Sequence, residues 1–142
     1  MIIVDVNLLL YAVISGFPQN ENARTWWEGV LNSPAVVGLT SPAVFGFLRI
    51  ATNPRVLESP VPVETASGYL REWLERPNVQ FVTPGPRHLD IALDLLAQAG
   101  TAGNLTTDAQ LAAIAIECDA EVFSNDNDLG RFPTLKWVNP LR

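Results

Sequence analysis

Apolar and polar positions form two patterns along the chain, one that predicts strands and one that predicts helices. Short, nearly continuous apolar runs are typical of strands buried on both faces of a sheet. Longer stretches with apolar residues three or four positions apart predict amphipathic helices. The predicted strands span residues 2–4, 35–39, 79–82 and 121–123, with a short fifth at 136–138. The predicted helices span about residues 7–14, 21–31, 41–52, 64–74, 87–98 and 107–117.

Capping motifs mark the first residues of two of these predicted helices. Ser41 is followed by Pro42, which predicts a helix with a serine cap and proline at its first position. The four residues from Thr107 to Gln110 fit the capping-box pattern. Since strands and helices alternate, the chain should form one domain over residues 1–142, with a parallel sheet covered by helices on both faces.

Composition narrows the class of protein further. Of the 142 residues, 48% are apolar and only 17% are charged, which favours a well-packed globule over a disordered chain. No apolar run is long enough to cross a membrane, and the start of the chain lacks the basic segment of a signal peptide. The single Cys118, which we expect to be buried, cannot form an internal disulfide. A cytoplasmic protein is therefore expected.

The net charge of −6 argues against a general nucleic-acid binder, which is normally basic. Part of this negative charge comes from four aspartates at the predicted ends of strands and starts of helices. They are Asp5 after the first strand, Asp108 in the last predicted helix, and Asp126 and Asp128 after the fourth strand. In a parallel sheet these points converge on the carboxyl edge, and clustered carboxylates favour Mg²⁺ or Mn²⁺.

Four segments together resemble the PIN-domain ribonucleases, and within them the VapC toxins of bacterial toxin–antitoxin pairs. They are DVNLLLYA at residues 5–12, FLRIATNP at 47–54, TDA at 107–109 and SNDNDLGRFP at 124–133. The resemblance implies a three-layer α/β/α domain with a central parallel sheet of four to five strands. It also implies a Mg²⁺- or Mn²⁺-dependent endoribonuclease that cuts structured RNA, such as transfer or ribosomal RNA, through a metal-activated water. Members are usually homodimers and are inhibited by a small VapB-type antitoxin.

Carried over residue by residue, the resemblance makes Asp5, Asp108 and Asp126 the metal-binding catalytic acids. The residues implied to support them are Asn7, Ser41, Ser124, Asp128 and Arg49. Asp128 would be a further ligand or a neighbour of the ligands, and Arg49 would bind phosphate or pair with an acid. Many family members also carry a glutamate about six residues beyond the position of Ser41, but this chain has only Val44-Phe-Gly-Phe47 there.

Several of these residues have a purely structural alternative. Asp5 could cap the next helix. Asp108 could lie in a first helical turn only because the helix dipole stabilises an acid there, and Asn-Asp clusters such as 125–128 are common in turns. The lone His88 is expected to face solvent or cap a helix. The tryptophans at 26, 27 and 73 could stack on RNA bases, although helical spacing favours a core or interface role.

Two other functions compete with the nuclease. A PIN-like module that binds without useful catalysis would be consistent with the missing glutamate and the acidic net charge. A haloacid-dehalogenase-type phosphatase also begins with an aspartate after its first strand. That reading needs a second aspartate at the position of Asn7 and a downstream lysine, whereas the only lysine is Lys136.

Overall fold

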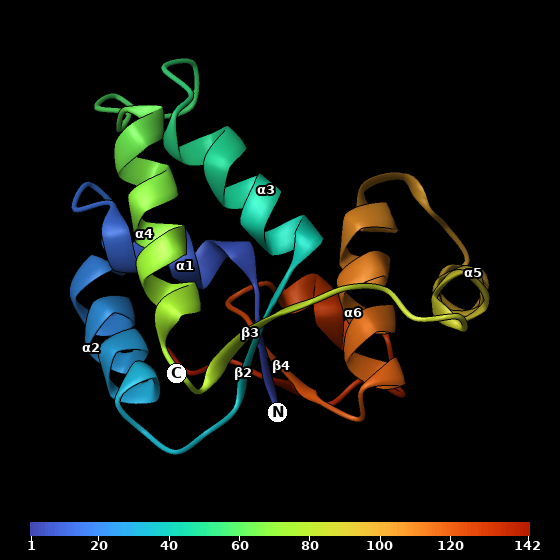
Figure 1. Cartoon of the computed structure of the whole chain (residues 1–142). Coiled ribbons are helices and arrows are strands. Elements are labelled where there is room, and N and C mark those ends of the chain that lie inside the picture. The colour runs from blue at the N-terminus through green and yellow to red at the C-terminus, as the bar shows by residue number, and fades with distance from the viewer.

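A five-stranded, wholly parallel sheet forms the centre of the computed structural model, which describes residues 1–142 (Figure 1). In spatial order the strands are β3 (Val79–Val82), β2 (Val37–Thr40), β1 (Ile2–Val4), β4 (Glu121–Phe123) and β5 (Trp137–Val138). Strands β2 and β3 are therefore added on one side of β1, and β4 and β5 on the other. The strand order reverses between the paired strands β1 and β4, and in open α/β sheets ligands bind outside the carboxyl ends of the strands at such a point.

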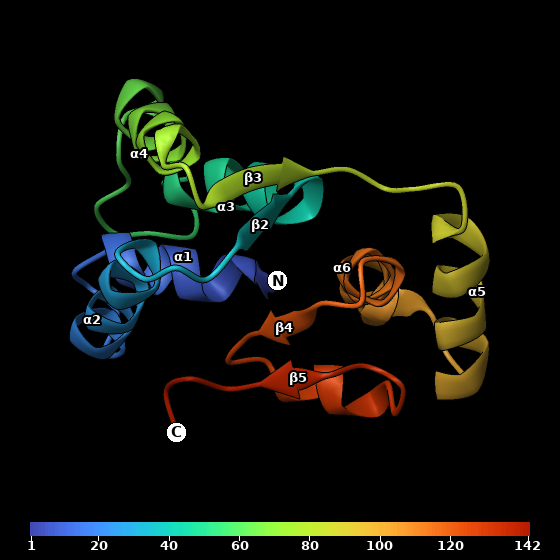
Figure 2. The ribbon, with the colours of Figure 1, turned by 60° about the horizontal axis from the view of Figure 1, so that its bottom comes forward.

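Helices cover both faces of this sheet, which gives the three layers seen edge-on in Figure 2. One face carries α1 (Val6–Val13), α2 (Asn20–Leu31), α3 (Ser41–Ala51) and α4 (Val63–Glu75). The other carries α5 (His88–Ala99) and α6 (Thr106–Glu117). Two 3₁₀ helices, η1 (Gly103–Leu105) and η2 (Asn127–Arg131), were not predicted. The predicted fold class is confirmed, with five strands. None of the helices is both long and apolar enough to span a membrane.

Each face of the sheet has its own apolar core, because the side chains of a strand alternate between the two faces. Val4 faces the core beneath α1 to α4, while its neighbour Ile3 faces the core beneath α5 and α6. In the first core, Trp27 packs edge-on against Trp73 with ring centroids 5.5 Å apart. Both are buried, so they are core residues and not a base-stacking surface; Trp26 is half-buried and stacks on Phe123.

Three local predictions were wrong. Thr40, not Ser41, caps α3, because Thr40 keeps the extended backbone of β2 and accepts a hydrogen bond from Ala43 N–H at 3.4 Å. Helix α6 begins at Thr106 without a side-chain cap, because the η1 turn leads directly into it. Cys118 is exposed, because it follows the last turn of α6, beyond the buried face of that helix.

The close approach of the central strands predicts that Gly38→Ala destabilises the fold. A Cβ at Gly38 would lie 2.6 Å from Ile3 Cδ1 and 2.8 Å from Val82 Cγ2, on two buried side chains with little room to move. Overpacking of this kind should lower the free energy of unfolding by about 1–3 kcal/mol, measured by urea denaturation.

The matched control is Gly29→Ala in α2, where a Cβ would meet nothing within 4 Å. That change should raise the free energy of unfolding by about 0.5–1 kcal/mol through helix propensity alone. Equal stabilities for the two variants would contradict the packing described for Gly38.

Candidate metal centre

Three carboxylates meet at the carboxyl edge of the sheet, where its strand order reverses. Asp5 follows β1 and caps α1, Asp126 follows β4 and caps η2, and Asp108 lies in the first turn of α6. One carboxylate oxygen from each of the three lies within 4.8 Å of the others. The structure thus brings together the three acids predicted as ligands, although they are 103 and 18 residues apart in the sequence.

Asp5 is the most constrained of the three acids. It is buried, and its Oδ1 accepts a hydrogen bond from Val6 N–H at 2.7 Å. Its Oδ2 accepts one from the Ser124 hydroxyl at 2.7 Å and one from the Asn7 amide at 3.2 Å. The capping role proposed as an alternative is therefore real. It also fixes the orientation of the carboxylate, so capping and ligand roles are compatible.

Asn7 and Ser124 connect the end of β1 to the loop that follows β4. The Asn7 amide donates to Ser124 Oγ at 3.0 Å, and Asn7 Oδ1 accepts from Asn125 N–H at 3.0 Å. Ser124 Oγ in turn accepts from Asp126 N–H at 3.0 Å. One buried hydroxyl therefore contacts the residues that carry two of the three acids, and it holds their separation fixed.

Burial and mutual repulsion make the negative charges of the cluster unfavourable. Burial raises the pKa of Asp5, although its hydrogen bonds act in the opposite direction. Burial, together with the charges of Asp126, Asp5 and Asp128, raises the pKa of Asp108 to about 7. A cation between the acids would relieve this repulsion, and a donor set made of oxygen atoms suits a hard divalent ion. The residues present therefore fit a divalent metal.

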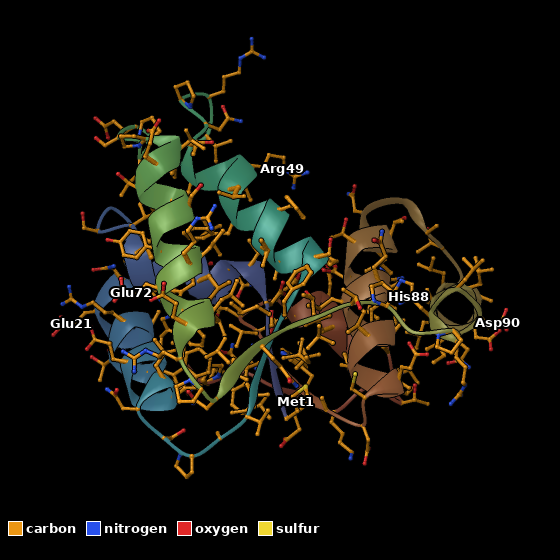
Figure 3. The ribbon with its side chains drawn as sticks, viewed as in Figure 1. Met1, Glu21, Arg49, Glu72, His88 and Asp90 are labelled. Atoms are coloured by element: carbon orange, nitrogen blue, oxygen red, sulfur yellow. The ribbon has the colours of Figure 1, made fainter.

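The remaining predicted residues lie at different distances from the three acids. Asp128 is exposed and outside the group of three, yet its charge still reaches Asp108. Ser41 is half-buried as the first residue of α3, directly after β2, and its side chain makes no hydrogen bond. Arg49 is exposed in the last turn of α3, points outward in Figure 3 and pairs with no acid. A phosphate-binding role for Arg49 stays a prediction.

Helix α3 brings no acid to the cluster. Its Gly46 approaches the residue that follows Asp5, because a Cβ at Gly46 would lie 3.3 Å from Val6 Cγ2. Phe47, next to Gly46, is fully buried in the core. The region where the family often has a glutamate is therefore filled by glycine and apolar side chains, and the cluster has three acids.

His88 stands outside the cluster, at the start of α5 (Figure 3). It is half-buried, so the expectation that it faces solvent or caps the helix was wrong: Arg87 is the residue at the cap position. No histidine or cysteine joins the three acids. The site therefore offers carboxylates alone for chemistry.

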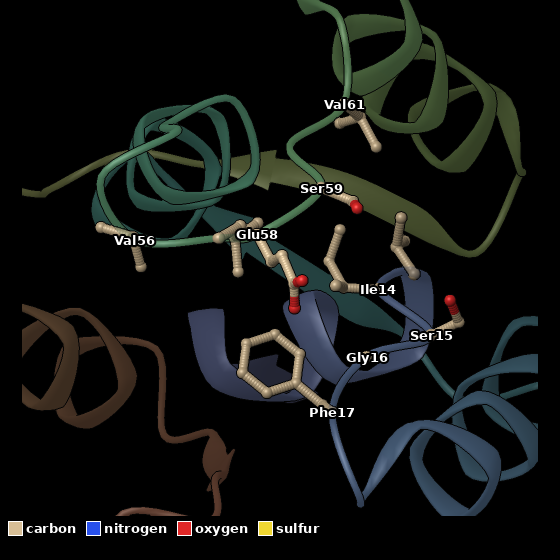
Figure 4. Close-up of a pocket in the computed structure, with 10 residues that line it drawn as sticks. Ile14, Ser15, Gly16, Phe17, Val56, Glu58, Ser59 and Val61 are labelled. Carbon is tan, nitrogen blue, oxygen red and sulfur yellow. The ribbon is translucent and has the colours of Figure 1, made fainter.

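A separate cavity of about 330 Å³ lies at the other end of α1 (Figure 4). It is lined by residues of the α1–α2 and α3–α4 connections, among them Ile14, Phe17 and Val61, and contains one acid, Glu58. It shares no residue with the acidic cluster. A single exposed carboxylate among mainly apolar side chains provides no constellation for catalysis.

Sequence reasoning missed two residues that touch the loop after β4. The Trp137 indole donates to the Ser124 carbonyl at 3.1 Å, and the Asn139 amide donates to Asn125 Oδ1 at 3.0 Å. The only signal available was the pairing of a short last strand beside β4, which does not say where its side chains bind.

Comparisons with known proteins agree with this geometry. The PIN domain family model matches residues 2–135. Ribonuclease VapC33 of Mycobacterium tuberculosis is 61% identical over 142 residues, which is 100% of this chain and 99% of that protein. The chain is thus related along its whole length to a protein named as a ribonuclease.

Solved structures show the same fold at low sequence identity. VapBC2 of Rickettsia felis, bound to a DNA fragment from its promoter, matches with a TM-score of 0.71 and 19% identity over 98% of each chain. The sarcin–ricin loop cleaving toxin VapC20 of M. tuberculosis matches with a TM-score of 0.69 and 14% identity, over 92% of this chain and 93% of that one. The chain belongs to the PIN-domain family and, within it, to the VapC ribonucleases.

Proposed function

We propose that this chain is a divalent-metal-dependent endoribonuclease, the toxin of a VapBC-type toxin–antitoxin pair, and that residues 1–142 form a single PIN domain. The observation that carries the proposal is the group formed by Asp5, Asp108 and Asp126, whose oxygens lie within 4.8 Å of one another. In a chain of the VapC ribonuclease family, such a group has a direct chemical purpose. The haloacid-dehalogenase alternative has no support from these relationships.

Asp5, Asp108 and Asp126 would hold Mg²⁺ or Mn²⁺. A bound ion would supply an activated water and would stabilise the charge that develops on the scissile phosphate. Ser124 and Asn7 keep Asp5 oriented toward its neighbours through hydrogen bonds of 2.7 and 3.2 Å. Because the Asp5 carboxylate is fixed before substrate arrives, little reorganisation would be needed during the reaction.

The products should carry a 5′-phosphate and a 3′-hydroxyl. Cleavage through the ribose 2′-hydroxyl needs a base beside it, commonly a histidine. The only histidine, His88, lies outside the acidic group. Water is therefore the nucleophile that the site favours, and 2′,3′-cyclic phosphate ends would contradict this assignment.

The proposed substrate is structured RNA in the cytoplasm, and the proposed inhibitor is a VapB-type antitoxin bound to a homodimer of this chain. The similar protein VapC20 is a sarcin–ricin loop cleaving toxin, and the similar VapBC2 is a toxin–antitoxin complex. With a net charge of −6, this chain should bind bulk RNA weakly. Recognition of a particular folded RNA, with arginines contacting its phosphates, is compatible with this negative net charge.

A second function is favoured by one observation. The segment Val44–Phe47 brings no acid to the cluster, which leaves three carboxylates where many relatives are expected to have four. A site with fewer charges would hold its metal more weakly, and the chain would then serve as a binding module. Metal affinity and cleavage together separate this possibility from the nuclease.

We predict that Asp108→Asn lowers the rate of RNA cleavage by about 100-fold or more, because it removes one charge that stabilises the metal and the transition state. Asp108 does not cap α6 and is only half-buried, so the fold should be retained. Purified protein, freed of antitoxin, would be incubated with total bacterial RNA and Mn²⁺ or Mg²⁺. EDTA should abolish the discrete cleavage products.

The matched control for this prediction is Asp90→Asn, in the first turn of the neighbouring helix α5, where the acid is exposed and remote from the cluster (Figure 3). It changes the same charge at an equivalent helical position and should cleave like the wild type. Full activity in Asp108→Asn, or cleavage that persists in EDTA, would refute the proposed metal chemistry.

We also predict that the metal-free protein becomes less stable as the pH rises from about 4 to about 7. The pKa of Asp108 is raised from 3.8 to about 7 in the folded protein, so the folded state binds its proton more tightly than the unfolded chain does. Ionisation therefore opposes folding, and the loss is complete above about pH 7. Because Asp108 is partly exposed and water screens it, we expect a loss of about 1–2 kcal/mol.

Urea unfolding in EDTA at pH 5 and pH 8 would measure this loss. Asp108→Asn should reduce the difference between the two pH values, and saturating Mn²⁺ at pH 8 should restore stability by binding the folded state. A metal-free protein that gains stability between pH 5 and pH 8 would contradict the electrostatic description of the cluster.

A further inference from the structure

The segment from Trp137 to Arg142 lies against the acidic loop, defined here as residues 124–128. Strand β5 runs beside β4 (Figure 2), and Val138 O accepts a hydrogen bond from Ser124 N–H at 3.0 Å. Side chains of the same segment then reach along the loop. The donors and acceptors are Trp137 to the Ser124 carbonyl, Asn139 to Asn125 and Arg142 to Asn127.

Both backbone polar groups of Ser124, its N–H and its carbonyl, form hydrogen bonds with the β5 segment. Its N–H donates to Val138 O, and its carbonyl accepts from the Trp137 indole at 3.1 Å. With the backbone fixed in this way, the Ser124 hydroxyl is directed to Asp5 and accepts from Asp126 N–H. Trp137 therefore binds directly to Ser124, the residue that connects two of the acids.

Asn139 provides a second connection to the same site. Its amide donates to Asn125 Oδ1 at 3.0 Å, while Asn125 N–H donates to Asn7 Oδ1 at 3.0 Å. Asn139 is itself fixed, because its Oδ1 accepts from Leu141 N–H at 3.0 Å. Asn125 is thus bound on one side by the β5 segment and on the other by the residue that contacts Asp5.

The ring of Trp137 also packs against Gly130 in η2, just beyond the acidic loop. A Cβ added to Gly130 in η2 would lie 3.3 Å from Trp137 Cζ3, so the indole ring packs closely against this glycine. Asp126 lies between the two points that Trp137 contacts, Ser124 and Gly130. Trp137 therefore restrains the chain on both sides of Asp126.

We propose that Trp137 and Asn139 are positioning residues of the metal centre, which hold Asp126 against Asp5 and Asp108 so that a divalent ion finds its ligands in place. The inference rests on the proposed function, since it requires that the three acids bind a metal. Without these contacts, repulsion among the three carboxylates would move the acidic loop away from Asp5 and Asp108. Groups that orient metal ligands through hydrogen bonds tune metal affinity in this way.

The test compares Mn²⁺ affinity in the wild type, Trp137→Phe and Asn139→Ala. Trp137→Phe removes the indole donor while keeping an aromatic ring, and Asn139→Ala removes the amide donor to Asn125. Free Mn²⁺ would be titrated by electron paramagnetic resonance against the full chain, without RNA or antitoxin. Each variant should raise the Kd for Mn²⁺ by about threefold to tenfold, the equivalent of one hydrogen bond.

Val79→Ala controls for a loss of stability alone. Val79 is buried at the start of β3, at the opposite edge of the sheet from the acidic loop's strand pair. This variant should lower the melting temperature but leave the Kd for Mn²⁺ unchanged.

Failure of the proposed function and failure of the positioning role would give different results. If the wild type binds no Mn²⁺, the proposed function and this inference both fall. If the wild type binds Mn²⁺ and folded Trp137→Phe and Asn139→Ala bind it equally well, the positioning role alone is overturned. Should Trp137→Phe not fold, Asn139→Ala decides the outcome, because Asn139 is only half-buried and belongs to no helix or strand.

Discussion

The hydrogen bond from the Ser124 hydroxyl to the Asp5 carboxylate joins the carboxyl ends of β1 and β4, where the strand order of the sheet reverses. Asp5 is buried and its ionised form is disfavoured there, so the bond and its companions from Val6 and Asn7 are what make the carboxylate tolerable. The same hydroxyl accepts from Asp126 N–H. The spacing of two acids thus depends on one buried serine.

Much of the fold follows from the sequence because the central strands β1 and β2 are buried on both faces of the sheet. The run at 2–4 and the alternation with amphipathic helices leave little choice but a parallel sheet covered twice. Details that depend on tertiary contacts could not be predicted from the sequence. Thr40 caps α3 because β2 ends one residue later than its apolar pattern, and Cys118 is exposed because α6 ends just before it.

The candidate site was accessible from sequence to the extent that acids follow strands. Asp5 and Asp126 were placed together by the convergence of parallel strand ends, whereas the supporting roles of Asn7 and Ser124 came from the resemblance to the PIN-domain ribonucleases. Trp137 and Asn139 could not be found in this way, since their roles depend on the directions of side chains in the two-residue strand β5 and in the residue that follows it. Nor could the sequence show that Asp128 is exposed, outside the group of three acids.

The most direct test of the whole account is a crystal structure of the chain grown with Mn²⁺, with the metal located by its anomalous scattering. The account predicts an anomalous peak bound by oxygens of Asp5, Asp108 and Asp126, with the Ser124–Asp5 hydrogen bond retained. A well-occupied peak elsewhere, or none between these three acids at saturating Mn²⁺, would contradict the claim that they form a preorganised metal centre.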